Sequence, residues 1–157
     1  MASANRTAAM LIKKILPAER ERALALAMDV FMQYEAHDYP KEGIETFRRF
    51  LADREKIEAL EMYGSYEGDE LTGMIAMGNE GEHVTLFFVD GKHQRRGVGR
   101  KLFEAALSRS SSETITVNSS AFAVGIYRRL GFTAVAEEQT SNGLRYTPMI
   151  YKNKNSG

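Results

Sequence analysis

A glycine-rich, basic turn joins a strand-like run to a helix-like run near the middle of this 157-residue chain. The strand-like run covers 84–89, the turn reads Gln94-Arg95-Arg96-Gly97-Val98-Gly99, and the helix-like run covers 100–107. A helix start offers unpaired backbone N–H groups and a partial positive charge. Glycine lets the backbone approach an anion closely, and arginine adds charge-assisted hydrogen bonds. The turn is therefore predicted to cradle the phosphates of a bound cofactor.

The charges around this turn support the same interpretation. Five cations lie within ten residues, namely Lys92, Arg95, Arg96, Arg100 and Lys101. Such a cluster at a helix start is costly unless an anion binds there; the alternative is a solvated basic turn. A dinucleotide fingerprint needs a third glycine where Leu102 stands, and a P-loop needs Gly-Lys-Ser/Thr, which is absent.

Composition argues against several other classes of protein. The chain has 21 Lys and Arg against 21 Asp and Glu, so we expect no nucleic-acid partner. It lacks an apolar run of about 18 residues and a secretory signal, so we expect no membrane partner. The absence of cysteine excludes disulfides, thiolate metal sites and a cysteine acyl-enzyme, and fits a cytoplasmic protein. Because His37, His83 and His93 lack metal-ligand spacing, we expect no metal site.

Hydrophobic periodicity and turn residues predict one domain over 10–152, with a flexible N-terminal tail at 1–9 and a C-terminal tail at 153–157. The expected elements, in chain order, are a strand at 10–15, helices at 17–35 and 41–53, strands at 59–66, 71–77 and 83–89, a helix ending near 108, a strand at 114–118, a helix around 123–130, and a closing hairpin of 132–138 and 144–151. The strand–helix–strand crossover after 89 implies one parallel pair of strands in a mixed sheet.

Two segments resemble motifs of the GNAT N-acetyltransferase superfamily. The turn 94–99 resembles its acyl-CoA motif, Gln/Arg-x-x-Gly-x-Gly/Ala. Asn118, followed by Tyr127-Arg128-Arg129-Leu130-Gly131-Phe132, resembles its second motif. The expected order of elements, βααβββαβαββ, is also that of the family along nearly the whole chain. The resemblance implies an α/β (α+β) GNAT fold, with a mixed, mostly antiparallel sheet of about seven strands and about four helices.

The resemblance also implies acetyl-CoA as the cofactor. Its pyrophosphate would lie on the amides of 95–100, and its pantetheine arm would run beside the fourth strand near Asn118. The amide of Phe88 would polarise the thioester carbonyl. The implied cofactor-binding residues are Phe88, Val89, Gln94, Arg95, Arg96, Gly97, Val98, Gly99, Arg100, Asn118 and Tyr127.

Two residues are candidates for proton transfer. The resemblance makes Tyr127 the general acid that protonates the leaving thiolate, although its helical stripe with Ile126 and Leu130 also fits a core aromatic residue. His83 is the candidate base, because an ordinary histidine pKa of about 6.5 suits neutral pH. The alternatives are a structural role for His83, with Glu35 or a water chain as the base. Without a cysteine or a Gly-x-Ser-x-Gly elbow, we expect direct attack in a ternary complex.

The resemblance implies an acceptor pocket built by the first two helices, the region around the fourth strand and the loop of the last hairpin. The segment 35–45 holds four acids and one lysine, and Phe31, Tyr34, Glu35 and Tyr39 would bind a cationic primary amine. A solvated helix junction is the alternative. The leading hypothesis is acetylation of a small amine, against acetylation of a protein N-terminus or lysine, or a non-catalytic acyl-CoA sensor. The resemblance also allows a homodimer.

Overall fold

The computed structural model describes residues 10–154, and the predicted N-terminal tail and the last three residues of the predicted C-terminal tail lie outside this range. Within it, eight strands form the order β1-β2-β3-β4-β5-β8-β6, and β7 pairs with β8 alone. All pairings are antiparallel except that of β4 with β5, which is parallel as predicted. Asn153, at the start of the predicted tail, is buried and donates its backbone N–H to the carbonyl of Glu113.

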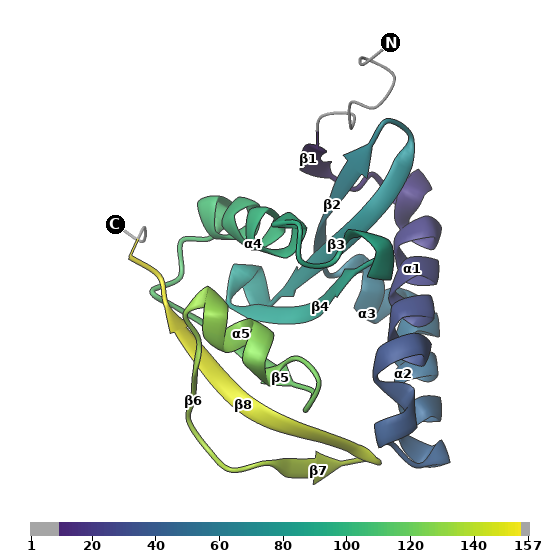
Figure 1. Ribbon diagram of the computed structural model, residues 1–157, viewed down its shortest axis with the longest axis vertical. Helices are drawn as coiled ribbons and strands as arrows, with labels where there is room; N and C mark the ends of the chain where they lie inside the picture. The colour runs from purple at the N-terminus through teal and green to yellow at the C-terminus, as the bar shows by residue number, and fades with distance from the viewer. Residues whose placement is uncertain (1–9, 155–157) are drawn as a thin grey trace.

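The elements follow the predicted order along the chain (Figure 1). The strands are β1 (Met10–Lys14), β2 (Glu61–Glu67), β3 (Glu70–Gly78), β4 (His83–Val89), β5 (Thr114–Ser119), β6 (Thr133–Ala134), β7 (Gln139–Ser141) and β8 (Leu144–Lys152). The α-helices are α1 (Arg20–Tyr34), α2 (Lys41–Ala52), α3 (Arg54–Glu58), α4 (Val98–Arg109) and α5 (Val124–Leu130).

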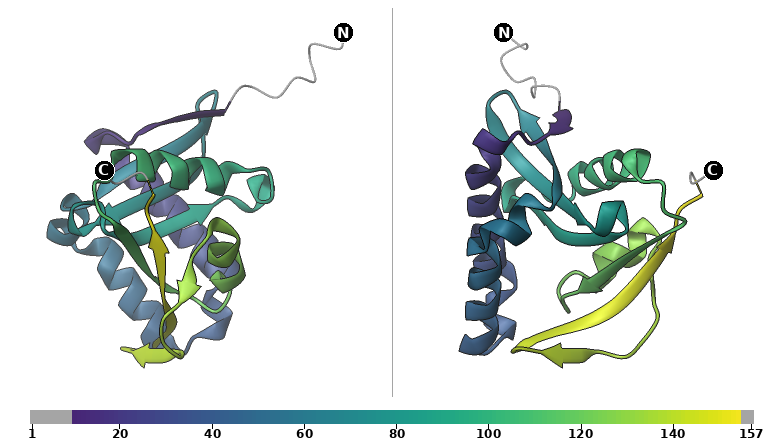
Figure 2. Two further views of the ribbon diagram at one scale, coloured as in Figure 1. Left: turned by 90° about the vertical axis from the view of Figure 1, so that its left-hand side faces the viewer. Right: turned by 180° about the vertical axis from the view of Figure 1, so that it is seen from behind.

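Two apolar cores form on the opposite faces of the sheet. Successive residues of β3 alternate between them, so that Met74 and Ala76 pack toward α1, whereas Ile75 and Met77 pack toward α4. Figure 2 shows α1 and α2 on one side of the sheet and α4 and α5 on the other. Among the described residues, no helix combines the length and apolar character needed to cross a bilayer.

The structure corrects two details of the predicted elements. A short helix, α3, lies between α2 and β2, and the Asp53 side chain caps it by accepting a hydrogen bond from the Lys56 N–H at 3.2 Å. The first strand of the closing hairpin is broken into β6 and β7. The Val135 N–H donates to the carbonyl of Pro148 in β8. Proline has no N–H with which to donate a hydrogen bond back to the first strand, so the pairing of the two strands stops there.

The parallel strands β4 and β5 pair over a very short length. Only His83 with Thr116 and Val84 with Val117 are in register. Beyond these two pairs β4 runs on to Val89 and β5 to Ser119 without further pairing between them. The strands therefore diverge in the middle of the sheet and leave an opening that side chains from both faces can line.

The β7–β8 hairpin closes the far end of this opening against α2 (Figure 1). Gly43 of α2 and Gly143 of the hairpin turn touch through their backbones, and a Cβ at Gly43 would overlap the carbonyl oxygen of Gly143. Thr46 donates its hydroxyl to the carbonyl of Asn142 at 2.7 Å. The hairpin and the helix are thus fastened directly to each other.

Candidate active site

A cavity of about 380 Å³ lies where β4 and β5 diverge. One wall comes from α1, the turn that follows it and α2. The opposite wall comes from the end of β5 and the start of α5, and residues 84–88 of β4 lie between them. The β7–β8 hairpin contributes residues 141, 142 and 144–146. Six of the residues predicted for the site line this cavity: Phe31, Glu35, Tyr39, Phe88, Asn118 and Tyr127.

The predicted phosphate cradle forms the start of α4. Gly97 is the N-cap residue with a φ of +83°, a left-handed conformation that glycine adopts without strain, and no side chain caps the helix there. The first helical bond runs from the Lys101 N–H to the Gly97 carbonyl. The N–H groups of Val98, Gly99 and Arg100 therefore have no partner within the helix and are directed beyond its end.

Side chains around the cradle tie it to its neighbours. Gln94 donates its side-chain amide to the carbonyl of Val89 at 3.0 Å, which links the turn to the end of β4. Arg100 donates to the carbonyl of Arg129 at 2.9 Å, which links α4 to α5. Arg95 and Arg96 are exposed. Free N–H donors, exposed guanidinium groups and open space around Gly97 are a donor set that fits a diphosphate.

Tyr127 is both a core residue and part of the cavity wall. It is only 6% exposed and lies edge-on to the rings of Phe87 and Phe132, with centroid distances of 5.9 and 5.2 Å. Burial, together with the negative charge of Glu35, raises the pKa of the Tyr127 phenol well above its ordinary value. The phenol therefore stays protonated at neutral pH and can donate a hydrogen bond into the cavity.

Glu35 follows the last residue of α1 and faces the same cavity. Desolvation by the surrounding protein raises the pKa of its carboxyl group to about 7, and the charge of Asp38 acts in the same direction. A hydrogen bond from Ser120 opposes the shift by stabilising the carboxylate. Glu35 therefore exchanges a proton close to neutral pH, which is the range in which a general base is effective.

His83 does not line the cavity. It is the first residue of β4, where the parallel pairing with β5 is still intact, and its Nδ1 lies 2.7 Å from the hydroxyl of Thr116. Burial lowers the pKa of its imidazole. The structure thus brings Glu35, and not His83, to the cavity that Tyr127 lines from the opposite side.

The predicted acceptor residues divide into two groups. Phe31 and Tyr39 line the cavity with stacked rings, and burial and the charge of Glu35 raise the pKa of Tyr39 to about 12. Tyr34 does not line it: its ring stacks on Phe122, and its hydroxyl lies against Gly91.

The part of the cavity around Phe31 and Tyr39, called here the acceptor wall, includes three residues that the sequence analysis missed. Phe47 stacks on Phe31 with ring centroids 4.1 Å apart, and helical periodicity could have placed it there. Thr46 and Arg145 carried no comparable signal. Arg145 donates to the carbonyl of Asp38 at 2.6 Å, and its own carbonyl accepts from the Tyr39 hydroxyl at 3.2 Å. These contacts fasten β8 to the turn after α1.

The family that this chain matches makes it an N-acetyltransferase that uses acetyl-CoA. Residues 35–153 match the family profile described as an acetyltransferase (GNAT) domain, which covers most of the chain. This protein therefore belongs to the GNAT family of acetyltransferases, as the two motifs indicated.

Known proteins of this family are similar to the chain over most of its length. It is 27% identical to the peptidyl-lysine N-acetyltransferase YjaB of Escherichia coli (strain K12), over 79% of this chain and 80% of the relative. A GCN5-related N-acetyltransferase from Rhodopseudomonas palustris has a TM-score of 0.78 at 20% identity, covering 94% of this chain and 98% of that one. PaiA N-acetyltransferase from Thermoplasma acidophilum, solved in complex with coenzyme A, has a TM-score of 0.72 at 17% identity, over 92% and 99%.

The raised pKa of Glu35 makes stability depend on pH in a defined direction. Its pKa is 4.5 in the unfolded chain and about 7 in the folded one, so the folded state binds the proton more tightly. The stability that this proton contributes is complete below pH 4.5 and is lost as pH rises through 7. Glu35→Gln is therefore expected to gain stability relative to the parent between pH 5 and pH 8, by at most about 3 kcal/mol.

Urea unfolding at a series of pH values measures this difference. Glu58→Gln is the matched control. Glu58 is exposed at the end of α3, and its substitution removes the same charge as Glu35→Gln does. The stability of this control should follow that of the parent at every pH. If the free energies of unfolding of the parent and of Glu35→Gln changed with pH in the same way, the Glu35 pKa would not be raised in the folded protein.

Proposed function

We propose that this chain transfers the acetyl group of acetyl-CoA to the primary amine of a small, cationic acceptor. One observation supports the proposal most strongly: Glu35 and Tyr127 line the same cavity, and the charge of Glu35 acts on the Tyr127 phenol. This cavity lies where β4 and β5 diverge, and its other side is rich in aromatic residues. The amine would attack the thioester carbonyl directly within a ternary complex.

The cofactor would bind along the route from the start of α4 to the gap between β4 and β5. The N–H groups of 95–100 and the guanidinium groups of Arg95 and Arg96 would hold the pyrophosphate. The pantetheine arm would lie beside Phe88 and Val89 of β4, opposite Asn118 of β5. The Phe88 amide would donate to the thioester oxygen, where negative charge develops during attack.

Glu35 and Tyr127 would handle the two proton transfers. Glu35 would accept the proton that the amine loses as its nitrogen bonds to the carbonyl carbon. Tyr127 would share its phenolic proton with the sulfur as the carbon–sulfur bond breaks, so that the leaving group departs as a thiol. His83, the base suggested by the sequence, lies outside the cavity, which supports Glu35 instead.

The shape and charge of the acceptor wall support a small cationic substrate. The backbone contact of Gly43 with Gly143 and the bonds that Arg145 makes to the turn after α1 close one end of the cavity. A protein substrate needs a groove open along its length, whereas a small amine needs only a pocket. Glu35 and the stacked rings of Phe31 and Tyr39 suit an ammonium group.

The second candidate is acetylation of a lysine side chain in a protein. The similarity to a peptidyl-lysine N-acetyltransferase favours it, because a lysine side chain is itself a flexible cationic amine. The same catalytic residues would serve both acceptors.

The base is tested by the pH dependence of kcat in saturating acceptor. In the parent, kcat should rise with pH through about 7 as Glu35 ionises. Glu35→Gln should lower kcat by about 100-fold and remove this acidic limb, because a general base contributes about that much. His83→Gln should keep both the rate and the limb. Loss of the limb in His83→Gln, with its retention in Glu35→Gln, would assign the base to His83.

The acid is tested by Tyr127→Phe, which keeps the ring packing and removes the proton. We expect kcat to fall by about 100-fold with an unchanged KM for acetyl-CoA, measured by thiol release. Tyr151→Phe is the matched control, since Tyr151 packs on Phe103 and Phe132 in the same core but does not line the cavity. A full rate in Tyr127→Phe at all pH values would contradict the assignment.

The acceptor class is tested by comparing kcat/KM for free diamines, neutral and anionic amines, and peptides with an internal lysine. Free cationic amines should react best, because the pocket is closed at one end and carries acidic and aromatic groups. Lysine peptides that outperform every free amine would establish the second candidate. A preference for neutral or anionic amines would contradict both.

A further inference from the structure

One histidine and three carboxylates gather away from the active site, where the β2–β3 hairpin meets the turn after β4. They are Glu67, Glu70, Asp90 and His93. We propose that they bind a divalent transition-metal ion of the Zn²⁺ class, with His93, Asp90 and Glu70 as ligands. This inference is independent of the proposed acceptor and of the catalytic roles.

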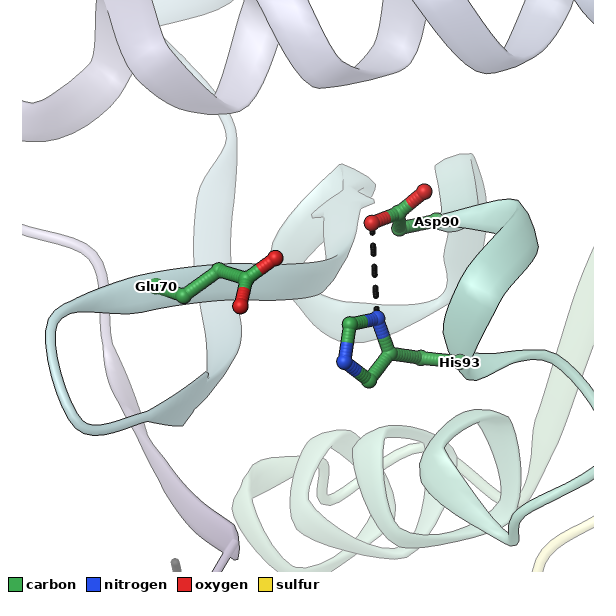
Figure 3. Close-up of side chains that lie close together, drawn as sticks. All are labelled: Glu70, Asp90 and His93. Atoms are coloured by element: carbon green, nitrogen blue, oxygen red, sulfur yellow. Dashed lines mark ion pairs between the residues drawn. The ribbon is translucent and has the colours of Figure 1, made fainter.

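The three proposed ligand side chains lie close together. One ligand atom from each of Glu70, Asp90 and His93 lies within 4.8 Å of the other two. Figure 3 shows the three side chains turned toward one another, with His93 Nδ1 facing the carboxylate of Asp90. Ligands about 2.1 Å from a common metal are about 3 to 4 Å apart. A small rotation of the exposed Glu70 side chain would therefore complete the geometry.

The imidazole of His93 is the strongest sign of a missing partner. His93 is 6% exposed, and its Nδ1 makes no hydrogen bond with any described residue. Asp90 Oδ2 lies 3.3 Å from this nitrogen, but not in hydrogen-bonding geometry. A buried ring nitrogen without a hydrogen bond is costly. A metal ion between the ring and the carboxylates would give this nitrogen a partner and would offset the negative charge of the carboxylates.

The other ring nitrogen also faces a carboxylate, at the same distance. His93 Nε2 lies 3.3 Å from Glu67 Oε2. With a metal bound at Nδ1, Nε2 would carry the proton and direct it toward this carboxylate, as is usual for metal-binding histidines. Glu67 would thus orient the histidine without binding the ion itself.

The charges of the cluster are also unbalanced. In the part of the chain that the structure describes, Glu67 and Asp90 form ion pairs with His93 alone, and Glu70 forms none. Arg22 lines a cavity together with Glu70 and Asp90, but it pairs with Glu19 at 3.8 Å and donates to the carbonyl of Asp69. A divalent cation would offset the repulsion among the three carboxylates, and one imidazole with carboxylate oxygens suits Zn²⁺ better than Ca²⁺ or Mg²⁺.

The ion could reach the cluster from solvent through a second cavity. This cavity has a volume of about 340 Å³, lies against α1, and is lined by Glu70, Asp90 and Asp29 among others. It shares no lining residue with the active-site cavity. The ion would therefore be structural, joining the β2–β3 hairpin to the turn directly before Gln94 of the phosphate cradle.

Zinc titration calorimetry on the full chain, freed of metal with a chelator, tests the proposal. The parent should bind one Zn²⁺ per chain, and Zn²⁺ should raise its melting temperature. Glu70→Gln and Asp90→Asn should each weaken binding by about tenfold or more. Glu70 is exposed, so its substitution leaves the core intact. Glu58→Gln, which removes an exposed charge elsewhere, should bind like the parent.

Two outcomes would overturn the proposal. One is the absence of saturable binding to the parent at millimolar Zn²⁺. The other is equal affinity in the parent, Glu70→Gln and Asp90→Asn, which would place the ion at another histidine such as His37 or His83. Neither outcome changes the expected rates of acetyl transfer, so failure here is separable from failure of the proposed function.

Discussion

The short parallel pairing between β4 and β5 is the constraint on which the rest of the structure depends. Two residue pairs hold the two halves of the sheet together, and beyond Val84 and Val117 the strands separate. Backbone groups in the middle of a sheet normally bond to a neighbouring strand. Here the inner edges of β4 and β5 face a cavity instead, which is where a thioester and its pantetheine arm could be held by backbone donors. The apolar cores on both faces keep the divergent strands in place.

The electrostatics of the cavity follow from this opening. Glu35 comes from the helical layer on one face, and Tyr127 comes from the layer on the other. They interact only because the sheet is open between them. Burial favours the neutral form of each, so a neutral phenol and a carboxyl group that titrates near pH 7 line one small space. Neither residue would have this character on a continuous sheet, where the strands would separate them.

The sequence predicted most of the fold, including the local elements on which the proposed cofactor site is built. The strand, turn and helix around Gly97 were predictable because phosphate cradles depend on adjacent residues, and the structure confirms β4 and α4 around them. The short helix α3 was not predicted, since five residues carry too little periodicity. The break between β6 and β7 depends on Pro148, which lies across the hairpin. The effect of Pro148 on the first strand depends on which residues of the two strands are paired. The pattern of residues within one strand does not define that pairing.

The side chains that meet across the fold were the hardest to foresee. His83 and Glu35 were both possible bases, and only the topology decides which of them faces Tyr127. The histidines looked unsuited to metal binding because their spacing along the chain is irregular. Yet His93 lies beside Asp90 of its own turn and Glu70 of the β2–β3 hairpin, which is far from it in the sequence and comes near only when the chain folds.

The contact of Gly43 with Gly143 has a consequence for how this protein can diverge. The two positions lie 100 residues apart, yet each occupies the space that a side chain at the other would need. Neither can acquire a larger residue unless the hairpin first withdraws from the helix. Over generations the pair is expected to persist or disappear together, and its loss would mark descendants whose pocket has widened to admit bulkier acceptors.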